Sequence, residues 1–209
     1  MSTLGALKAE IADDLLRSDL STQIASEISN AIRYFQNKRF YFNETRGETF
    51  ATVEAQAVYS STDDTAIPDF IEIDQITVTD GTSTWELDVL TPKEWEIATA
   101  LATGSRPTGY AYFNQSLMLY PTPDDAYTVR MIGHIKKTAP ATDEEAGNVW
   151  MTEAYQLLRY RAAKMVSATK MLDSGRAQLF ANLEGDEFQR LKAETAARVT
   201  SNSVAPTEF

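Results

Sequence analysis

The sequence predicts an α+β protein: a helical bundle of about four helices, two N-terminal and two C-terminal, with an inserted antiparallel β module. Apolar residues recur at helical spacing near both ends of the chain, whereas between these ends they alternate in short segments separated by turn-forming residues. We therefore expect residues 1–40 and 148–199 to form the helical bundle, residues 41–147 the inserted β module, and residues 200–209 a flexible C-terminal tail.

The N-terminal segment predicts two helices. The first carries apolar residues at helical spacing: Leu4, Leu7, Ile11 and Leu15. Ser18-Asp19 marks a break, after which the side chain of Ser21 or Thr22 is expected to cap the second helix. The second helix carries a longer apolar stripe and is expected to end near Arg39: Ile24, Ile28, Ala31, Ile32 and Phe35.

Between Phe40 and residue 135, apolar and polar residues alternate in short segments, which predicts β-strands. One strand is expected to end at Val58-Tyr59, and the others are expected to cover residues 71–78, 84–87, 109–113, 117–120 and 127–135. Asp80-Gly81 predicts a hairpin turn, and Asn114-Gln115 predicts another. Along residues 71–78 the apolar side chains change from one face to the other, which predicts a bulge near Asp74-Gln75.

A short helix is predicted within the β module. Thr91 provides a capping hydroxyl, Pro92 suits the first helical position, and Glu94 places an acid in the first turn. This helix is expected to run to about Ala102.

Helical spacing returns near Asn148. One face of the next helix is lined by apolar residues: Met151, Ala154, Leu158, Ala162, Met165 and Leu172. Asp173-Ser174-Gly175 interrupts the pattern, and a last helix is predicted from about Arg176 toward Arg198. Gly185 is its weakest point, because glycine costs about 1 kcal/mol relative to alanine in a helix interior.

The charge is unevenly distributed. The chain has a formal net charge of −11, and residues 41–149 alone carry −12, while residues 1–40 carry 0 and residues 150–209 carry +1. An acidic surface repels phosphate, which argues against a nucleic-acid-binding protein. The same surface is compatible with a wall past which DNA slides without sticking.

The composition narrows the chemistry further. The chain has no cysteine, which excludes disulfides and cysteine-bound metals and favours synthesis in a reducing cytoplasm. Its first residues lack the pattern of a signal peptide. No apolar run approaches the roughly 18 residues that span a bilayer.

Residue patterns typical of enzymes are missing from the sequence. There is no G-x-S-x-G motif, no cysteine nucleophile and no glycine-rich phosphate loop. His134 is the only histidine and lies among basic residues, so a surface or packing role is favoured over metal binding. Most paired acids fall in predicted turns, where aspartate bonds the backbone. We expect no enzymatic activity, no cofactor and no metal.

Two basic segments allow a functional interpretation. Residues 38–42 mix bases with aromatic rings, which suits stacking on single-stranded nucleic acid; the surrounding acid favours a helix end followed by core aromatics. The helix from Met151 to Leu172 carries four bases: Arg159, Arg161, Lys164 and Lys170. These bases form either a solvated face or an inter-subunit face that meets the acidic β module of a neighbouring copy or an acidic patch on another ring.

Five segments in order resemble a known family. They are one helix-to-strand segment running from 30–34 through 39–44, then 67–71, 106–110 and 119–124, and the helix 150–163 after a short acidic loop. Their order and spacing resemble the head-to-tail adaptor, or connector, proteins of tailed bacteriophages, in particular the podovirus type, also called tail tubular proteins. The resemblance covers about residues 5–200.

The resemblance implies a structural protein of the virion, located at the head–tail interface and assembled in the cytoplasm of the bacterial host. In such families about twelve copies form a ring below the portal protein, and DNA passes through its channel without specific binding. The ring also contacts tail nozzle or tail fibre proteins. We expect residues 200–209 to become ordered on the portal, with the apolar or rigid residues of this segment docking there: Val204, Pro206 and Phe209.

Two other classes of function remain open at this point. The first is a tail-completion or other tail-associated structural protein, which has a different neighbour in the virion. The second is a carbohydrate-binding or hydrolytic tail protein, which requires carboxylates and exposed aromatics such as Trp85 or Trp95 in one groove.

Overall fold

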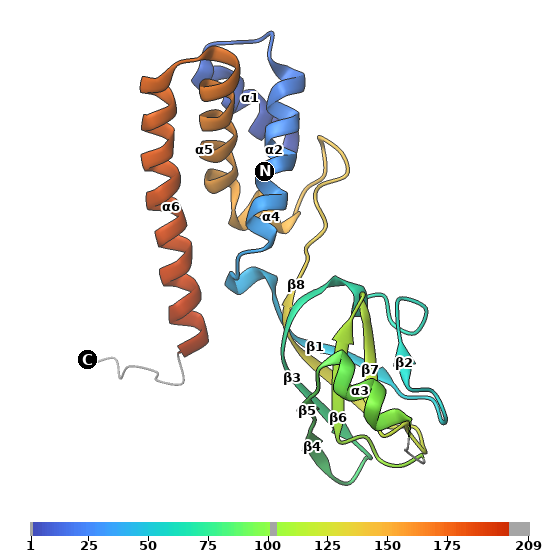
Figure 1. Ribbon diagram of the computed structural model, residues 1–209. Coiled ribbons are helices and arrows are strands. Elements are labelled where there is room, and N and C mark those ends of the chain that lie inside the picture. Colours follow the sequence, from blue (N-terminus) through green and yellow to red (C-terminus); the bar gives the residue numbers. More distant parts are fainter. Residues whose placement is uncertain (1, 101–103, 201–209) are drawn as a thin grey trace, which may run out of the picture. The chain divides into compact units, whose positions relative to one another are not determined.

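The computed structural model describes residues 2–100 and 104–200 of the chain (Figure 1). These residues form two compact units, one made of the residues up to Asn43 together with those from Lys137 onward, and the other of Glu44–Lys136. The first, the helical unit, is built from helices; the second, the β unit, holds two four-stranded sheets and one α-helix within its described residues. The predicted α+β fold class is therefore confirmed.

The helical unit begins with α1 (Leu4–Leu15) and α2 (Ser21–Gln36). The hydroxyl of Thr3 accepts a hydrogen bond from the amide of Ala6 at 3.2 Å, which caps α1. The predicted side-chain cap of α2 is wrong: Leu20 precedes the helix, no side chain caps it, and burial of Leu20 in the core fixes this end instead. The helix also ends three residues before the predicted Arg39.

The C-terminal part of the helical unit is more divided than predicted. A single helix over residues 151–172 is replaced by α4 (Val149–Glu153), α5 (Tyr155–Val166) and the π-helical turn η3 (Ser167–Met171). Leu172 follows in a left-handed conformation, with a φ of 53°, and its side chain is 82% exposed. Its predicted place on the buried face is wrong, because the wider π turn rotates the chain out of register with the α-helical spacing.

The last helix, α6 (Ser174–Thr200), continues through Gly185 without a break. At its start the carboxylate of Asp173 accepts a hydrogen bond from the amide of Arg176 at 2.9 Å. α5 is the central helix of the unit and packs against α1, α2 and α6 (Figure 1). Its buried face combines large residues with two alanines, which let the neighbouring helices approach closely: Leu157, Leu158, Ala162, Ala163 and Val166.

The aromatic residues after α2 enter the core of the helical unit. Phe40 is fully buried, Phe42 on η1 (Tyr41–Asn43) is 9% exposed, and their rings stack with centroids 5.2 Å apart. Trp150 completes the cluster and contacts Phe42 edge to face. The packing interpretation of residues 38–42 is confirmed for these aromatics, each of which contributes roughly 1.5–3 kcal/mol through burial.

The first sheet of the β unit has the order β1-β8-β3-β4, and all of its pairs are antiparallel. Its strands are β1 (Glu44–Ala51), β8 (Thr128–Ile135), β3 (Phe70–Thr79) and β4 (Thr84–Glu86). The short 3-10 turn η2 (Ile67–Asp69) leads into β3. The second sheet has the order β2-β7-β6-β5, with β2 (Val58–Tyr59), β7 (Ser116–Tyr120), β6 (Gly109–Phe113) and β5 (Asp88–Val89).

The β unit is not antiparallel throughout, because β5 pairs in parallel with β6. The connection between these two strands contains α3 (Pro92–Thr99), and a parallel pair requires such a crossover. Thr91 and Glu94 form the reciprocal bonds of a capping box, so the predicted start of this helix is confirmed. Its predicted end at Ala102 lies outside the described residues.

The predicted turns and bulge of the β unit are confirmed. Gly81 adopts a φ of 88° in the hairpin between β3 and β4, which suits a residue without a Cβ atom. Asn114 and Gln115 turn the β6–β7 hairpin with φ values of 51° and 60°. Between Ile73 and Gln75 the register of β3 against β8 shifts; Ile76 and Val78 after the shift are buried, and Ile71 and Ile73 before it are partly buried.

Candidate interaction surfaces

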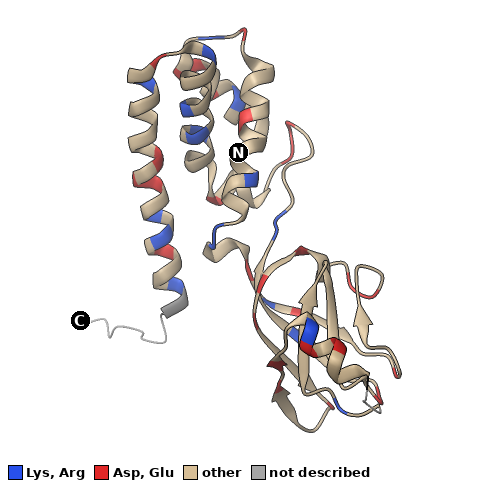
Figure 2. Ribbon diagram, viewed as in Figure 1, with Lys and Arg blue, Asp and Glu red and all other residues tan. Residues whose placement is uncertain are grey.

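The acidic charge of the chain is concentrated in the β unit. Residues 44–136 hold 15 acidic and five basic side chains, a net charge of −10, whereas the remaining residues carry −1. Figure 2 shows acidic residues on the strands and connecting loops of this unit. Its surface is therefore one that repels phosphate groups.

The predicted basic face of residues 159–170 is largely engaged within the chain. The guanidinium of Arg159 binds both carboxylate oxygens of Asp14 at 2.7 Å and Glu10 at 2.8 Å, which ties α5 to α1. Lys170 lies apart on η3 and is exposed. Arg159 and Lys170 are thus not brought together at one surface.

The other two bases of this face meet at Glu184 on α6. Arg161 donates to its carboxylate at 2.9 Å, and Lys164 forms a second short ion pair with it. The side chain of Glu184 is only 10% exposed, so its charge is stabilised by these two cations rather than by water. The guanidinium carbon of Arg161 also lies 3.8 Å from the ring centroid of Tyr34, within cation–π range.

A hollow of about 230 Å³ adjoins this charge cluster. It lies where α2, α5 and α6 meet and is lined by Tyr34, Phe35, Lys164, Ala181, Glu184, Gly185 and Phe188. A Cβ atom added to Gly185 meets nothing within 4 Å. The sequence prediction missed this hollow, although an unexplained glycine in the middle of a long helix was its signal.

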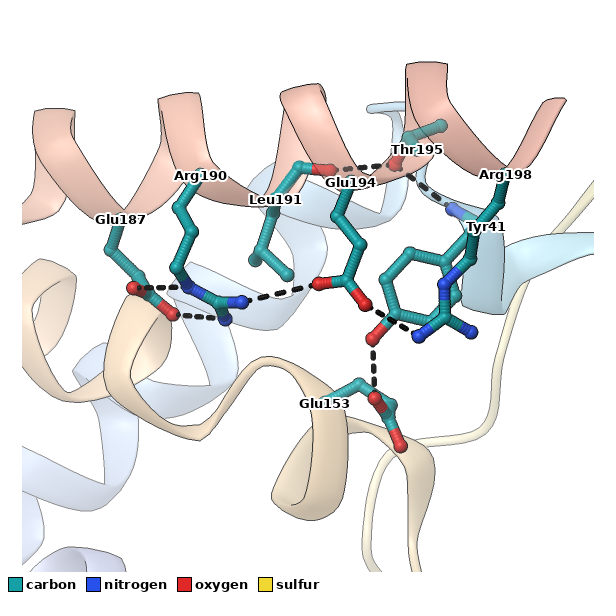
Figure 3. Close-up of polar contacts among 8 residues, drawn as sticks. All are labelled: Tyr41, Glu153, Glu187, Arg190, Leu191, Glu194, Thr195 and Arg198. Carbon is teal, nitrogen blue, oxygen red and sulfur yellow. Dashed lines mark hydrogen bonds and ion pairs between the residues drawn. The ribbon is translucent and has the colours of Figure 1, made fainter. Parts of the chain in front are cut away.

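A polar network holds the C-terminal half of α6 against η1 and α4 (Figure 3). Arg190 pairs with Glu187 at 2.8 Å and Glu194 at 3.1 Å, and Glu194 also binds Arg198. The guanidinium carbon of Arg198 lies 3.7 Å from the ring centroid of Tyr41. These contacts hold the C-terminal half of α6 in place, and residues 201–209 follow this helix in the sequence.

Tyr41 anchors this network to two further elements. Its phenol donates a short hydrogen bond to the carboxylate of Glu153 on α4. Its amide donates to the hydroxyl of Thr195 at 3.1 Å, and that hydroxyl in turn donates to the carbonyl of Leu191. Burial, reinforced by the hydrogen bond to Glu153, raises the pKa of Tyr41 to about 12.

The residues expected to dock on a portal, Val204, Pro206 and Phe209, lie outside the described residues. The two tryptophans considered for a carbohydrate groove are half-buried and bind the backbone of their own unit. Trp85 donates its indole N–H to the carbonyl of Pro107 at 2.7 Å, and Trp95 donates to that of Leu119 at 2.9 Å. Both side chains therefore pack the β unit.

His134 lies in β8, is only 2% exposed, and stands in register with Glu44 and Glu72 of the neighbouring strands. Across residues 2–100 and 104–200, no three His, Asp or Glu side chains gather closely enough to hold a metal ion. In the same part of the chain, no helix combines the length and apolarity needed to cross a membrane.

Comparison with known protein families gives a match. A family model described as SU10 adaptor protein matches residues 2–207, which include nearly all of both units. None of the curated proteins matches the chain.

Proposed function

Because this chain belongs to the SU10 adaptor protein family, we propose that it forms a ring that joins the portal of the DNA-filled head to the tail and lines the DNA channel. Membership makes the protein a structural adaptor of a bacteriophage virion. The ring holds about twelve copies, as closed rotational symmetry allows, and belongs to the podovirus type of connector. Its partners are the portal protein on one side and tail nozzle or tail fibre proteins on the other.

The segregation of charge supports this proposal most directly. A channel for DNA works best when its wall does not bind phosphate, because each bound phosphate adds affinity and slows passage. The β unit, with a net charge of −10, is suited to line such a channel. We accordingly assign the channel wall to the β unit.

The polar network on α6 supports a docking role for the segment that follows it. Six charged or phenolic groups fix the end of this helix on η1 and α4. A peptide that leaves a rigid helix loses less entropy on binding than one that leaves a mobile helix. In this proposal residues 200–209 reach the portal, and Val204, Pro206 and Phe209 contact it.

The proposal is tested by combining the purified full-length protein with purified portal rings. We expect complexes in which electron microscopy reveals a second ring of about twelve copies bound to one face of the portal. The control is the protein alone at the same concentration and salt. Failure to bind the portal, together with binding to isolated tail structures, would instead support a tail-completion protein.

A further inference from the structure

The hollow at Gly185 has the properties of an anchor pocket for one apolar side chain. Its volume of about 230 Å³ is below the roughly 300–1,000 Å³ typical of small-molecule sites. The rings of Tyr34 and Phe188 form part of its wall, and Tyr34 is 45% exposed at its rim. Single apolar side chains inserted into such pockets dominate the affinity of many protein interfaces.

Gly185 is not explained by the packing of its own chain. It has no positive φ, and a Cβ atom built on it meets nothing within 4 Å. Glycine is the poorest helix former after proline, yet it stands in the middle of the 27-residue helix α6. Its lack of a side chain has one visible effect, which is that the mouth of the hollow stays open.

The charges around the hollow select an acidic occupant. Lys164 and Arg161 bring two positive charges to the single negative charge of Glu184, which leaves a net charge of +1 beside the hollow. An apolar side chain flanked by carboxylates matches this arrangement, since complementary charge fixes the orientation and register of an interface.

The same chain carries such a surface in its β unit. Val89 in β5 is 73% exposed, and Ile97 in α3 is 62% exposed. Asp88 and Glu96 are exposed and directly adjacent to these two apolar residues in sequence. The acids beside these exposed apolar residues match the positive rim of the hollow.

We propose that, within the adaptor ring, the hollow at Gly185 of one copy receives helix α3 of a second copy, with Ile97 inserted between Tyr34 and Phe188. This inference rests on the proposed function, because it names the contact that joins neighbouring copies. The hollow and α3 are different surfaces, so the contact is heterologous and repeats around a closed ring.

Disulfide trapping tests the contact without requiring a complete ring. The chain has no cysteine of its own, so the variants Gly185→Cys and Ile97→Cys each carry a single thiol. Mixed under mild oxidation, they are expected to form a covalent dimer about ten-fold faster than either variant alone, because the contact raises their effective concentration. The matched control replaces Gly185→Cys with Ala193→Cys, an exposed position two turns further along α6.

Equal rates of dimer formation for the mixed pair and the control pair overturn the proposal.

A second experiment uses Gly185→Leu, which fills the mouth of the hollow, and Ala193→Leu as its control. Circular dichroism confirms that both variants fold. We expect Gly185→Leu to abolish ring formation on the portal and Ala193→Leu to leave it intact. If Gly185→Leu forms normal rings, the proposed contact is wrong, but the proposal of an adaptor ring is still supported. A trapped dimer without any wild-type ring refutes the ring but supports the contact.

Discussion

A Cβ atom on Gly133 would lie 2.2 Å from the carbonyl oxygen of Glu72, far inside any real contact between these atoms. Gly133 stands in register with Ile73, the residue after Glu72, where the register of β3 shifts against β8. The irregular β3 backbone bends toward its neighbour there, and only a residue without a side chain fits below it. The change of face that the sequence predicted within β3 therefore depends on a glycine more than 50 residues later.

This close approach predicts that Gly133→Ala is strongly destabilising. Overpacking against backbone atoms forces the strands apart, and we expect a loss of about 3 kcal/mol in the free energy of unfolding. Denaturant unfolding followed by tryptophan fluorescence measures it. Gly47→Ala is the matched control in the same sheet, because a Cβ atom there meets nothing within 4 Å. Similar losses for both variants would contradict this account of the strand.

The ion-pair cluster at Glu184 predicts a second large effect. In Glu184→Gln the side chains of Arg161 and Lys164 lose their shared charge partner in a half-buried site. We expect a loss of about 2 kcal/mol in the free energy of unfolding. Asp186→Asn, two residues away on the exposed face of α6, is the control and should change stability by less than about 0.5 kcal/mol. A stable Glu184→Gln variant would show that water solvates the cluster.

Alkaline pH is expected to destabilise the helical unit. Burial, aided by hydrogen bonds to Glu153 and Glu10 respectively, raises the pKa of Tyr41 and of Tyr155 to about 12. An unfolded tyrosine ionises near pH 10, so the folded state holds these protons more tightly than the unfolded state. The resulting stability is complete below about pH 10 and is lost as the pH rises through about 12.

The measurement is the free energy of unfolding as a function of pH, with tyrosinate absorbance recorded in parallel. Tyr41→Phe removes one of the two groups, and its stability should fall less steeply between about pH 10 and 12 than that of the wild type. Tyr34→Phe changes a partly exposed ring on α2 and serves as the comparison. Identical slopes for Tyr41→Phe and the wild type would exclude the proposed role of Tyr41.

Deletion of residues 201–209 is expected to leave the folded units unchanged and to weaken binding to the portal. The described part of α6 and its network end before this segment, so the melting temperature should stay within about 1 °C. Loss of two apolar anchors should weaken portal binding at least ten-fold, as measured by surface plasmon resonance. Unchanged affinity of the truncated protein would show that the docking residues lie elsewhere.

Because the β unit is acidic, we expect that the protein neither binds nor cleaves nucleic acid. At physiological salt, we expect no change in the fluorescence anisotropy of labelled duplex or single-stranded DNA up to about 10 μM protein, since non-specific affinity needs positive potential. We also expect no turnover of DNA, polysaccharide or peptidoglycan. Turnover that a single carboxylate substitution abolishes would assign the protein a catalytic role.

The features that the sequence predicted well are determined by neighbouring residues. The capping box of Thr91 and Glu94 involves residues three positions apart, and the turn at Asn114-Gln115 depends on residues that tolerate positive φ. The bulge in β3 was visible because the alternation of its own apolar residues changed face. In each case the signal and the structure lie within one short segment.

The features that escaped prediction depend on residues far apart in the chain. Arg159 was expected on an exposed basic face, but its partner Asp14 lies 145 positions earlier and only the folded bundle brings the two together. The parallel pairing of β5 with β6 depends on the path taken by the intervening helix. The hollow at Gly185 is formed by three helices, and no single segment contains its pattern.

The insertion of the β unit between α2 and α5 has a consequence for synthesis on the ribosome. The apolar faces of α1 and α2 are covered by α5, which the ribosome adds about 120 residues after α2, a delay of roughly 6–24 s at common rates of translation. During that interval α1 and α2 contact each other but lack α5, and the β unit gains its last strand only near the end of the interval. Chaperones that shield short apolar helices should therefore determine how much of this protein a host produces.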